Sequence, residues 1–244
     1  MKPDIRSCFS YGFEKVKDNP LFYILGFFLL AGIGVAIKLI AQGFGFIFNL
    51  VVLQSILGIS QRSAILPEYI ISVITGIVLG FFLAPFLVGY FRGMKKEYDG
   101  GKAEPLDILL GVDVLTPSVA NYAVASLIFI AGCICCIIPG ILLAPLPCLT
   151  IYFLAKGETI GFSALAKAVE TLKSNPVLIL WNLVFMLFAA LGILFCIVGV
   201  LVTAPISICA AYKLFRQVTG ENEPQPPAIM LEDETPGEGD SKDL

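Results

Sequence analysis

Long apolar segments, each about the length of a helix that crosses a lipid bilayer, dominate this sequence. A helix needs about 20 mainly apolar residues to span the hydrocarbon core. The chain is 57% hydrophobic and 14% charged, whereas a soluble domain has about 25% charged residues. We therefore expect an all-α, polytopic integral membrane protein. The six predicted transmembrane helices are residues 20–41, 69–91, 117–137, 139–155, 176–197 and 199–215.

A further apolar stretch, residues 44–60, contains three polar residues, and the basic residues indicate whether it crosses. Lys and Arg beside membrane spans stay on the cytoplasmic side. If 44–60 does not cross and the N-terminus is cytoplasmic, 14 of the 16 Lys and Arg residues are cytoplasmic. We therefore expect a multi-pass protein of the cell (inner) membrane, with cytoplasmic N- and C-termini and 44–60 at or dipping into the outer face. Lys38, near the outer end of the first span, would then reach the interface with its long side chain.

The dipeptide Ala-Pro occurs three times at a spacing of 60 residues, with the prolines at Pro85, Pro145 and Pro205. The preceding segments GIVLGFFLAP, CIIPGILLAP and CIVGVLVTAP align without gaps. Self-similarity at a fixed period indicates an internal repeat. Eleven residues after each proline the chain has a basic residue, namely Lys96, Lys156 and Arg216.

A polar residue followed by proline marks the start of each odd-numbered span. A polar N-cap side chain accepts a free backbone N–H, and proline suits the first helical position. A potentially amphipathic segment, which suits the headgroup layer, precedes each pair. The three pairs are Asn19-Pro20, Thr116-Pro117 and Asn175-Pro176.

These patterns predict three repeats of an interfacial helix plus a helical hairpin, within one membrane domain of residues 1–219. The first repeat has 65 residues between its opening proline and its Ala-Pro, against 28 and 29 in the others. We assign the excess to an outer insertion at about 42–68. The repeat units are about 3–96, 104–156 and 159–216. Residues 220–244, with eight acids and one lysine, predict a disordered, acidic cytoplasmic tail.

The motifs KDNP and KSNP, the turn at Pro139-Gly140 and the Ala-Pro helices resemble a group of prokaryotic six-span proteins of unknown function. That group is related to the membrane domain attached to some glycerophosphodiester phosphodiesterases. The resemblance covers about residues 5–217. In those enzymes a separate soluble domain with histidines and metal-binding carboxylates performs catalysis. This sequence has no such domain, so the resemblance implies no activity.

Two sets of residues are candidates for function. Pro85, Pro145 and Pro205 bend helices near the middle of the bilayer, where three kinks would surround a cavity for a lipid or another amphiphile. Alternatively, Ala and Pro simply allow close helix packing. The second set would contact anionic lipid or only orient the chain, and it consists of Arg92, Lys95, Lys96, Lys156 and Arg216.

The residue types present argue against an enzyme. The chain has no histidine, which excludes His-based acid–base catalysis and His metal ligands. We find no nucleophile–base pair and no metal-ligand cluster, and we expect no cofactor and no nucleic-acid partner. We therefore favour a non-enzymatic membrane protein that acts through membrane lipids or as a partner of other membrane proteins. A transporter or permeation pathway for a small amphiphile is the alternative, and the oligomeric state is not indicated.

Overall fold

Helices form all of the regular structure in the part of the chain that the computed structural model describes, which is residues 4–48, 50–51, 61–194 and 196–221. The predicted acidic tail lies outside the described residues from 222 onward, as do 49 and 52–60 of the stretch 44–60. The elements are α1 (Ile5–Asp18), η1 (Leu21–Leu25), α2 (Gly26–Phe48), α3 (Gln61–Gly80), η3 (Phe81–Leu83), α4 (Ala84–Tyr98), η4 (Pro105–Val114), α5 (Leu115–Cys135), α6 (Ile137–Leu143), α7 (Pro145–Ala155), α8 (Ser163–Ser174), α9 (Val177–Leu194) and α10 (Cys196–Val218).

Five of the described helical segments are long and apolar enough to cross a membrane. The pair α8–α9, bent by 102° between its two helices, gives a sixth if it is counted as one span. The predicted fold class is therefore confirmed: the chain is an all-α polytopic membrane protein. The five segments are Leu21–Phe48, Ile71–Tyr98, Pro105–Cys135, Ile138–Ala155 and Gly199–Val218.

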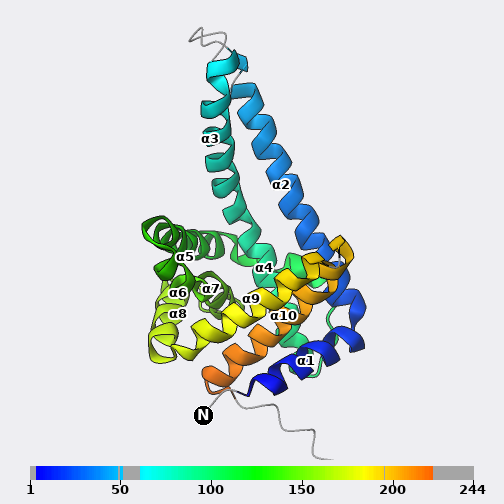
Figure 1. The fold of residues 1–244 in the computed structure, drawn as a ribbon. Coiled ribbons are helices and arrows are strands. Elements are labelled where there is room, and N and C mark those ends of the chain that lie inside the picture. The colour runs from blue at the N-terminus through cyan, green and yellow to red at the C-terminus, as the bar shows by residue number, and fades with distance from the viewer. Residues whose placement is uncertain (1–3, 49, 52–60, 195, 222–244) are drawn as a thin grey trace, which may run out of the picture.

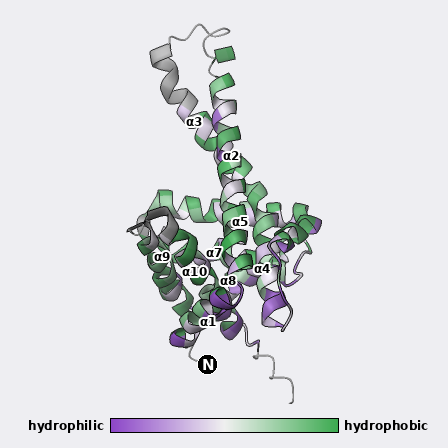
Figure 2. Cartoon of the chain, turned by 90° about the vertical axis from the view of Figure 1, so that its right-hand side faces the viewer, coloured by the Kyte–Doolittle hydropathy of each residue, from purple (hydrophilic) through white to green (hydrophobic). Residues whose placement is uncertain are grey.

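The helices converge in one packed region, which we call the hub, and three helical hairpins leave it in different directions (Figure 1). The hub consists of α1, α4, η4, α7, α8 and the part of α10 from Ala204 onward. The hairpins are α2–α3, α5–α6 and α9–α10. The hairpin α2–α3, which we call the arm, extends farthest from the hub (Figure 1). Hydrophilic residues gather at the hub end of the molecule, whereas α2 and α5 are mainly hydrophobic (Figure 2).

The arm corrects two predictions about the first repeat. The first span does not end at residue 41, because α2 continues to Phe48. Residues 44–48 are thus the end of α2 rather than part of a separate segment. The reason lies in the sequence QGFGFIF, which has no proline or charge to end the helix. The apolar segment Leu21–Phe48 has 28 residues, or about 42 Å of helix, and is longer than the roughly 30 Å hydrocarbon core.

Each short helix of the hub packs against one helix that begins at an Ala-Pro pair or contains it. Helix η4 packs on α4, α8 packs on α7, and α1 packs on α10. The helix α4 also packs on α7, and both contact α10. The first helix of the chain therefore closes the hub by packing on the last helix.

Backbones approach closely where these pairs meet, and glycine makes this possible. A Cβ on Gly111 of η4 would lie 1.9 Å from the carbonyl oxygen of Pro85. A Cβ on Gly89 of α4 would lie 2.0 Å from the carbonyl oxygen of Ile108. Since both separations are far below van der Waals contact, only glycine lets η4 lie against α4 in this way.

Aromatic side chains fill the space between α4, α7 and α10. The ring of Tyr212 lies 5.9 Å from that of Phe91 and 5.6 Å from that of Tyr152, both edge-on. The Tyr152 ring also lies 5.7 Å from the ring of Phe215. Edge-to-face pairs contribute about 0.5–1.5 kcal/mol each beyond their burial. This cluster therefore holds α4, α7 and α10 together.

Two of the three predicted polar–proline helix starts are confirmed. A helix begins directly after Asn19, whose side-chain oxygen accepts a hydrogen bond from Phe22 N at 3.3 Å. After Asn175, Pro176 forms a turn and α9 begins at Val177. The prediction for Thr116 is wrong, because Thr116 lies inside α5. The helical segment that contains α5 starts earlier, at Pro105 of η4. Glu104 and Asp107 form a reciprocal capping box at that start.

Candidate functional site

The three predicted prolines all lie buried in the hub. The short 3-10 turn η3 precedes Pro85, and α6 ends just before Pro145. The regular α-helix is therefore interrupted at both positions. Pro205 lies inside α10 without a break. None of the three lines the cavities described below. The prolines therefore belong to the packed centre of the described structure, where the hairpins meet.

Within the described part of the chain, four of the five predicted lipid-contacting residues, all except Lys95, form ion pairs. The Arg92 Nη1 lies 2.7 Å from Asp113 Oδ1, and the Lys96 Nζ lies 3.0 Å from Asp107 Oδ2. These two pairs tie α4 to η4. The remaining pairs join Lys156 and Arg216 to Glu221. Each of these four cations therefore has a carboxylate partner within the chain, and contact with anionic lipid stays a prediction.

Glu221 links the C-terminal ends of α7 and α10. Its carboxylate accepts hydrogen bonds from Lys156 Nζ and, at 2.7 Å, from the Tyr152 hydroxyl. The Arg216 Nη1 lies 3.4 Å from the second carboxylate oxygen. Burial alone would raise the pKa of Glu221, but hydrogen bonds from Lys156 and Tyr152 and the positive charges of Lys156 and Arg216 lower it below the ordinary value. The carboxylate is therefore held in its charged form.

Asn121 of α5 joins the start of α8 to the second hairpin. Its side-chain nitrogen donates to the carbonyl oxygens of Pro117 and Gly161 at 2.9 and 2.8 Å. Its side-chain oxygen accepts from Leu165 N at 3.2 Å. Asn121 is fully buried, and its bonds to Gly161 and Leu165 fix where α8 lies relative to α5.

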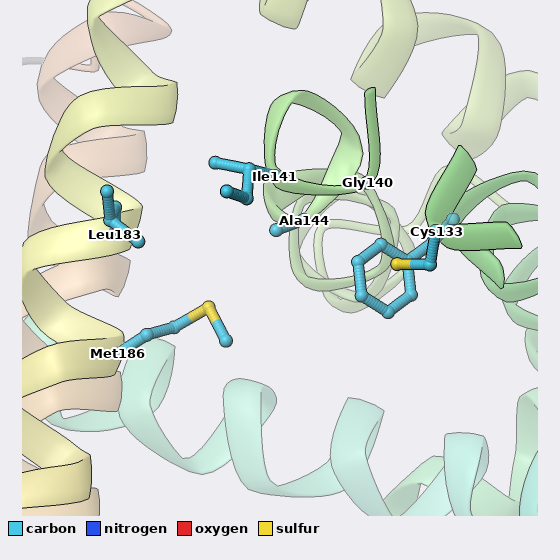
Figure 3. A pocket seen from close by; sticks show the side chains of 7 residues that line it. Cys133, Gly140, Ile141, Ala144, Leu183 and Met186 are labelled. Carbon is cyan, nitrogen blue, oxygen red and sulfur yellow. The ribbon is translucent and has the colours of Figure 1, made fainter. Parts of the chain in front are cut away.

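An apolar groove separates the second and third hairpins, and we call it the inter-hairpin groove. Its first part has a volume of about 190 Å³. In Figure 3, Leu183 and Met186 of α9 face Ile141 and Ala144 across the gap, with Cys133 of α5 beyond. All the side chains around this part are apolar or sulfur-containing. It therefore suits a hydrocarbon chain better than a polar ligand.

A second part of the inter-hairpin groove continues between α7, α9 and α10, with a volume of about 320 Å³. Ala144 and Met186 line both parts, so the two are adjoining. Asn182 and Ser207 provide polar atoms in this second part. The Ser207 hydroxyl donates to the Thr203 carbonyl oxygen at 2.8 Å, so its hydrogen atom is already engaged.

The arm contains a separate groove between α2 and α3, about 570 Å³ in volume, which we call the arm groove. Lys38 and Gln42 of α2 and Tyr69 and Ser72 of α3 line it. Lys38 lies ten residues before the end of α2, so it is not at the outer end of a helix as predicted. The arm groove thus places a basic residue and three hydrogen-bonding side chains between otherwise apolar helices.

Sequence reasoning missed both grooves as sites. The signal for the arm groove was present, because Lys38 and Gln42 are four residues apart and share one face of α2. The inter-hairpin groove had no such signal, since its lining is apolar and comes from helices far apart in sequence. Comparison of the chain with protein-family models, with curated proteins and with solved structures gave no match.

Proposed function

We propose that this protein acts through direct contacts with membrane lipid and holds a lipid acyl chain in the inter-hairpin groove. The groove's apolar lining beside a packed centre is the observation that carries this proposal. A volume of about 320 Å³ in its larger part is near the lower limit for small-molecule pockets, about 300 Å³, and suits one flexible chain.

The alternative of a permeation pathway through kinked helices has less support. Such a pathway needs polar groups along its length, and intramembrane ionisable residues usually mark it. The inter-hairpin groove has no ionisable side chain except the thiols of Cys133 and Cys148 among its described lining residues. Pro85, Pro145 and Pro205 are buried in the hub. Both observations favour lipid binding from the side over passage through the centre.

The remaining parts of the proposal concern organisation and location. Three repeated units are supported by the pairing of η4 with α4, α8 with α7 and α1 with α10. Residence in the cell (inner) membrane with both termini cytoplasmic is supported by the basic residues of the hub. The absence of histidine supports a non-enzymatic role. The relation to the membrane domain of glycerophosphodiester phosphodiesterases rests on the KDNP and KSNP motifs. Besides lipids, other membrane proteins are the partners that we propose.

Filling the inter-hairpin groove tests the proposal. Ala189 of α9 lines it, so Ala189→Phe should reduce the lipid that remains bound after purification in mild detergent. Ala190 is adjacent, exposed and outside the lining, which makes Ala190→Phe the matched control. Mass spectrometry would count bound lipid per protein. Equal lipid content in the two variants and the natural chain would contradict the proposal.

A further inference from the structure

A third groove lies where the first spanning segment and η4 both begin, and we call it the boundary groove. It has a volume of about 530 Å³. Its first wall includes Leu21, Leu25 and Leu29, which are four residues apart and therefore share one helix face. Its second wall is formed by residues 102–106. Unlike the inter-hairpin groove, it has charged side chains in its lining.

The two walls of the boundary groove run side by side in the same direction. At one end, the Asn19 side-chain nitrogen donates to the carbonyl oxygen of Ala103 at 2.9 Å. Farther along both walls, a Cβ on Gly26 would lie 3.0 Å from Cδ1 of Ile108. Because residue 103 lies opposite 19 and residue 108 opposite 26, the order of residues along each wall is the order along the groove.

The charged residues of the lining lie at the Asn19 end. Lys102 and Glu104 are the neighbours of Ala103, and both are exposed while Ala103 is buried. Leu25 and Leu29 come progressively farther from this end along the first wall. The boundary groove is therefore charged at the Asn19 end and apolar beyond it.

Two segments of the chain place the Asn19 end at the edge of the hydrocarbon core. The first apolar segment that can cross a membrane begins at Leu21, and another begins at Pro105. Both starts line the boundary groove. From Leu21 to Leu29 the leucine face extends about 12 Å, which fits within one leaflet of a core about 30 Å thick. A lipid lying here would have its headgroup beside the charged end.

The two charged groups at this end have no ionic partner among the residues of known placement. Neither Lys102 nor Glu104 forms an ion pair there. The Glu104 carboxylate accepts the capping hydrogen bond from Asp107 N, and a carboxylate has room for several more. The charged end thus offers one ammonium group and one carboxylate to a ligand.

We propose that the boundary groove binds phosphatidylethanolamine, with its phosphate on Lys102, its ammonium on Glu104 and an acyl chain along the leucine face. A headgroup with one charge of each sign complements this end, whereas a purely anionic headgroup would be repelled by Glu104. The ethanolamine ammonium also has N–H groups to donate to the carboxylate, and choline has none. This inference rests on the proposed lipid-binding function and names a second lipid site with its headgroup class.

Native mass spectrometry of the full-length protein in detergent tests the inference. The protein is mixed with equal amounts of phosphatidylethanolamine, phosphatidylcholine and phosphatidylglycerol that carry the same acyl chains, and each bound lipid is counted. We expect the natural chain to prefer phosphatidylethanolamine over both others. Glu104→Gln should lower the preference over phosphatidylcholine about fivefold, as the loss of one hydrogen bond implies. The glutamine oxygen can still accept the bond from Asp107 N, so η4 stays capped.

Variants of lysine separate the phosphate contact from the ammonium contact. Lys102→Gln should lower the binding of phosphatidylethanolamine and phosphatidylcholine alike, about fivefold, because both lipids have the phosphate. Glu170→Gln and Lys173→Gln remove the same charges from exposed positions on α8. Both control variants should bind the three lipids as the natural chain does.

The outcomes separate this inference from the proposed function. Equal binding of phosphatidylethanolamine and phosphatidylcholine by the natural chain, an unchanged ratio in Glu104→Gln, or a preference for phosphatidylglycerol overturns the inference. Millimolar phosphoethanolamine should not displace the lipid, because the acyl chain contributes to binding, and displacement would overturn the inference as well. The lipid count in Ala189→Phe tests the inter-hairpin groove by itself, so each proposal can fail while the other stands.

Discussion

The guanidinium of Arg216 lies over the ring of Tyr98, with 3.7 Å between its central carbon and the ring centroid. The Arg216 side chain is only 9% exposed, so this contact between α10 and α4 is desolvated. A stacked cation contributes more when water is excluded. Arg216 and Tyr98 therefore join α10 to α4 at the hub end of both helices. Glu221 contacts Arg216 at the same place.

Replacing Arg216 by lysine should destabilise the hub. Lysine keeps the charge but loses the planar stack on Tyr98, and we expect a loss of about 1–2 kcal/mol in the free energy of unfolding. Thermal unfolding in detergent, followed by circular dichroism, measures this loss. Lys17→Arg on the exposed face of α1 is the control. An unfolding temperature equal to that of the natural chain would show that the stack contributes nothing.

Removing the carboxylate of Glu221 should change stability in a pH-dependent way. Because the folded-state pKa of Glu221 is lowered, its contribution is present above the unfolded value of about 4.3 and is lost as the pH falls through the folded value. Glu221→Gln should therefore lower the unfolding temperature at pH 7, and the difference should shrink toward pH 3.5. Glu14→Gln, exposed on α1, provides the comparison. A difference that stays constant with pH would contradict the charged pairing.

Adding a methyl group to Gly111 should separate η4 from α4. Its Cβ would lie 1.9 Å from a backbone oxygen, which cannot move without shifting a helix, and overpacking of this kind costs about 1–3 kcal/mol or more. Gly111→Ala should therefore unfold at a lower temperature than the natural chain. Gly43→Ala in α2, where a Cβ meets no atom within 4 Å, should have no such effect. Equal stability of both variants would argue against the close η4–α4 packing.

Truncating Asn121 should loosen the second hairpin from α8. The change to alanine removes three hydrogen bonds and leaves the Leu165 N–H without its partner, at a cost of about 2–4 kcal/mol. Hydrogen exchange should show faster opening in the first turn of α8 than in α1. Ser126→Ala, four residues beyond Tyr122 on α5, is a control of similar size. Unchanged exchange in α8 would contradict the role of Asn121.

The proposed topology predicts opposite accessibility for the two ends of the arm. In a variant without other cysteines, Arg62→Cys near the tip and Lys102→Cys beside the hub should react from different sides of the membrane. A membrane-impermeant maleimide applied to intact cells should label only position 62. Labelling of both positions from outside would overturn the arrangement of basic residues on one side.

The sequence predicted local features of the fold well, because local chemistry determines them. The amphipathic segments before Asn19 and Asn175 became α1 and α8, and the apolar stretches became helices. The end of α2 was missed because the first span was given only the length that crosses a bilayer, whereas the apolar sequence QGFGFIF continues the helix to Phe48. The ion pairs of the hub could not be predicted, since Lys156 and Glu221 are 65 residues apart and meet only after three helices have packed.

Helix α1 buries Cys8, Gly12 and Val16, and α10, on which it packs, is the last described helix. During synthesis, N-terminal segments leave the ribosome first. The apolar stripe of α1 therefore rests on the bilayer surface or on a chaperone until α10 has been inserted. Packing of α1 into the hub is consequently completed only after α10 has been synthesised, and any truncation before α10 leaves the earliest helix without its binding surface.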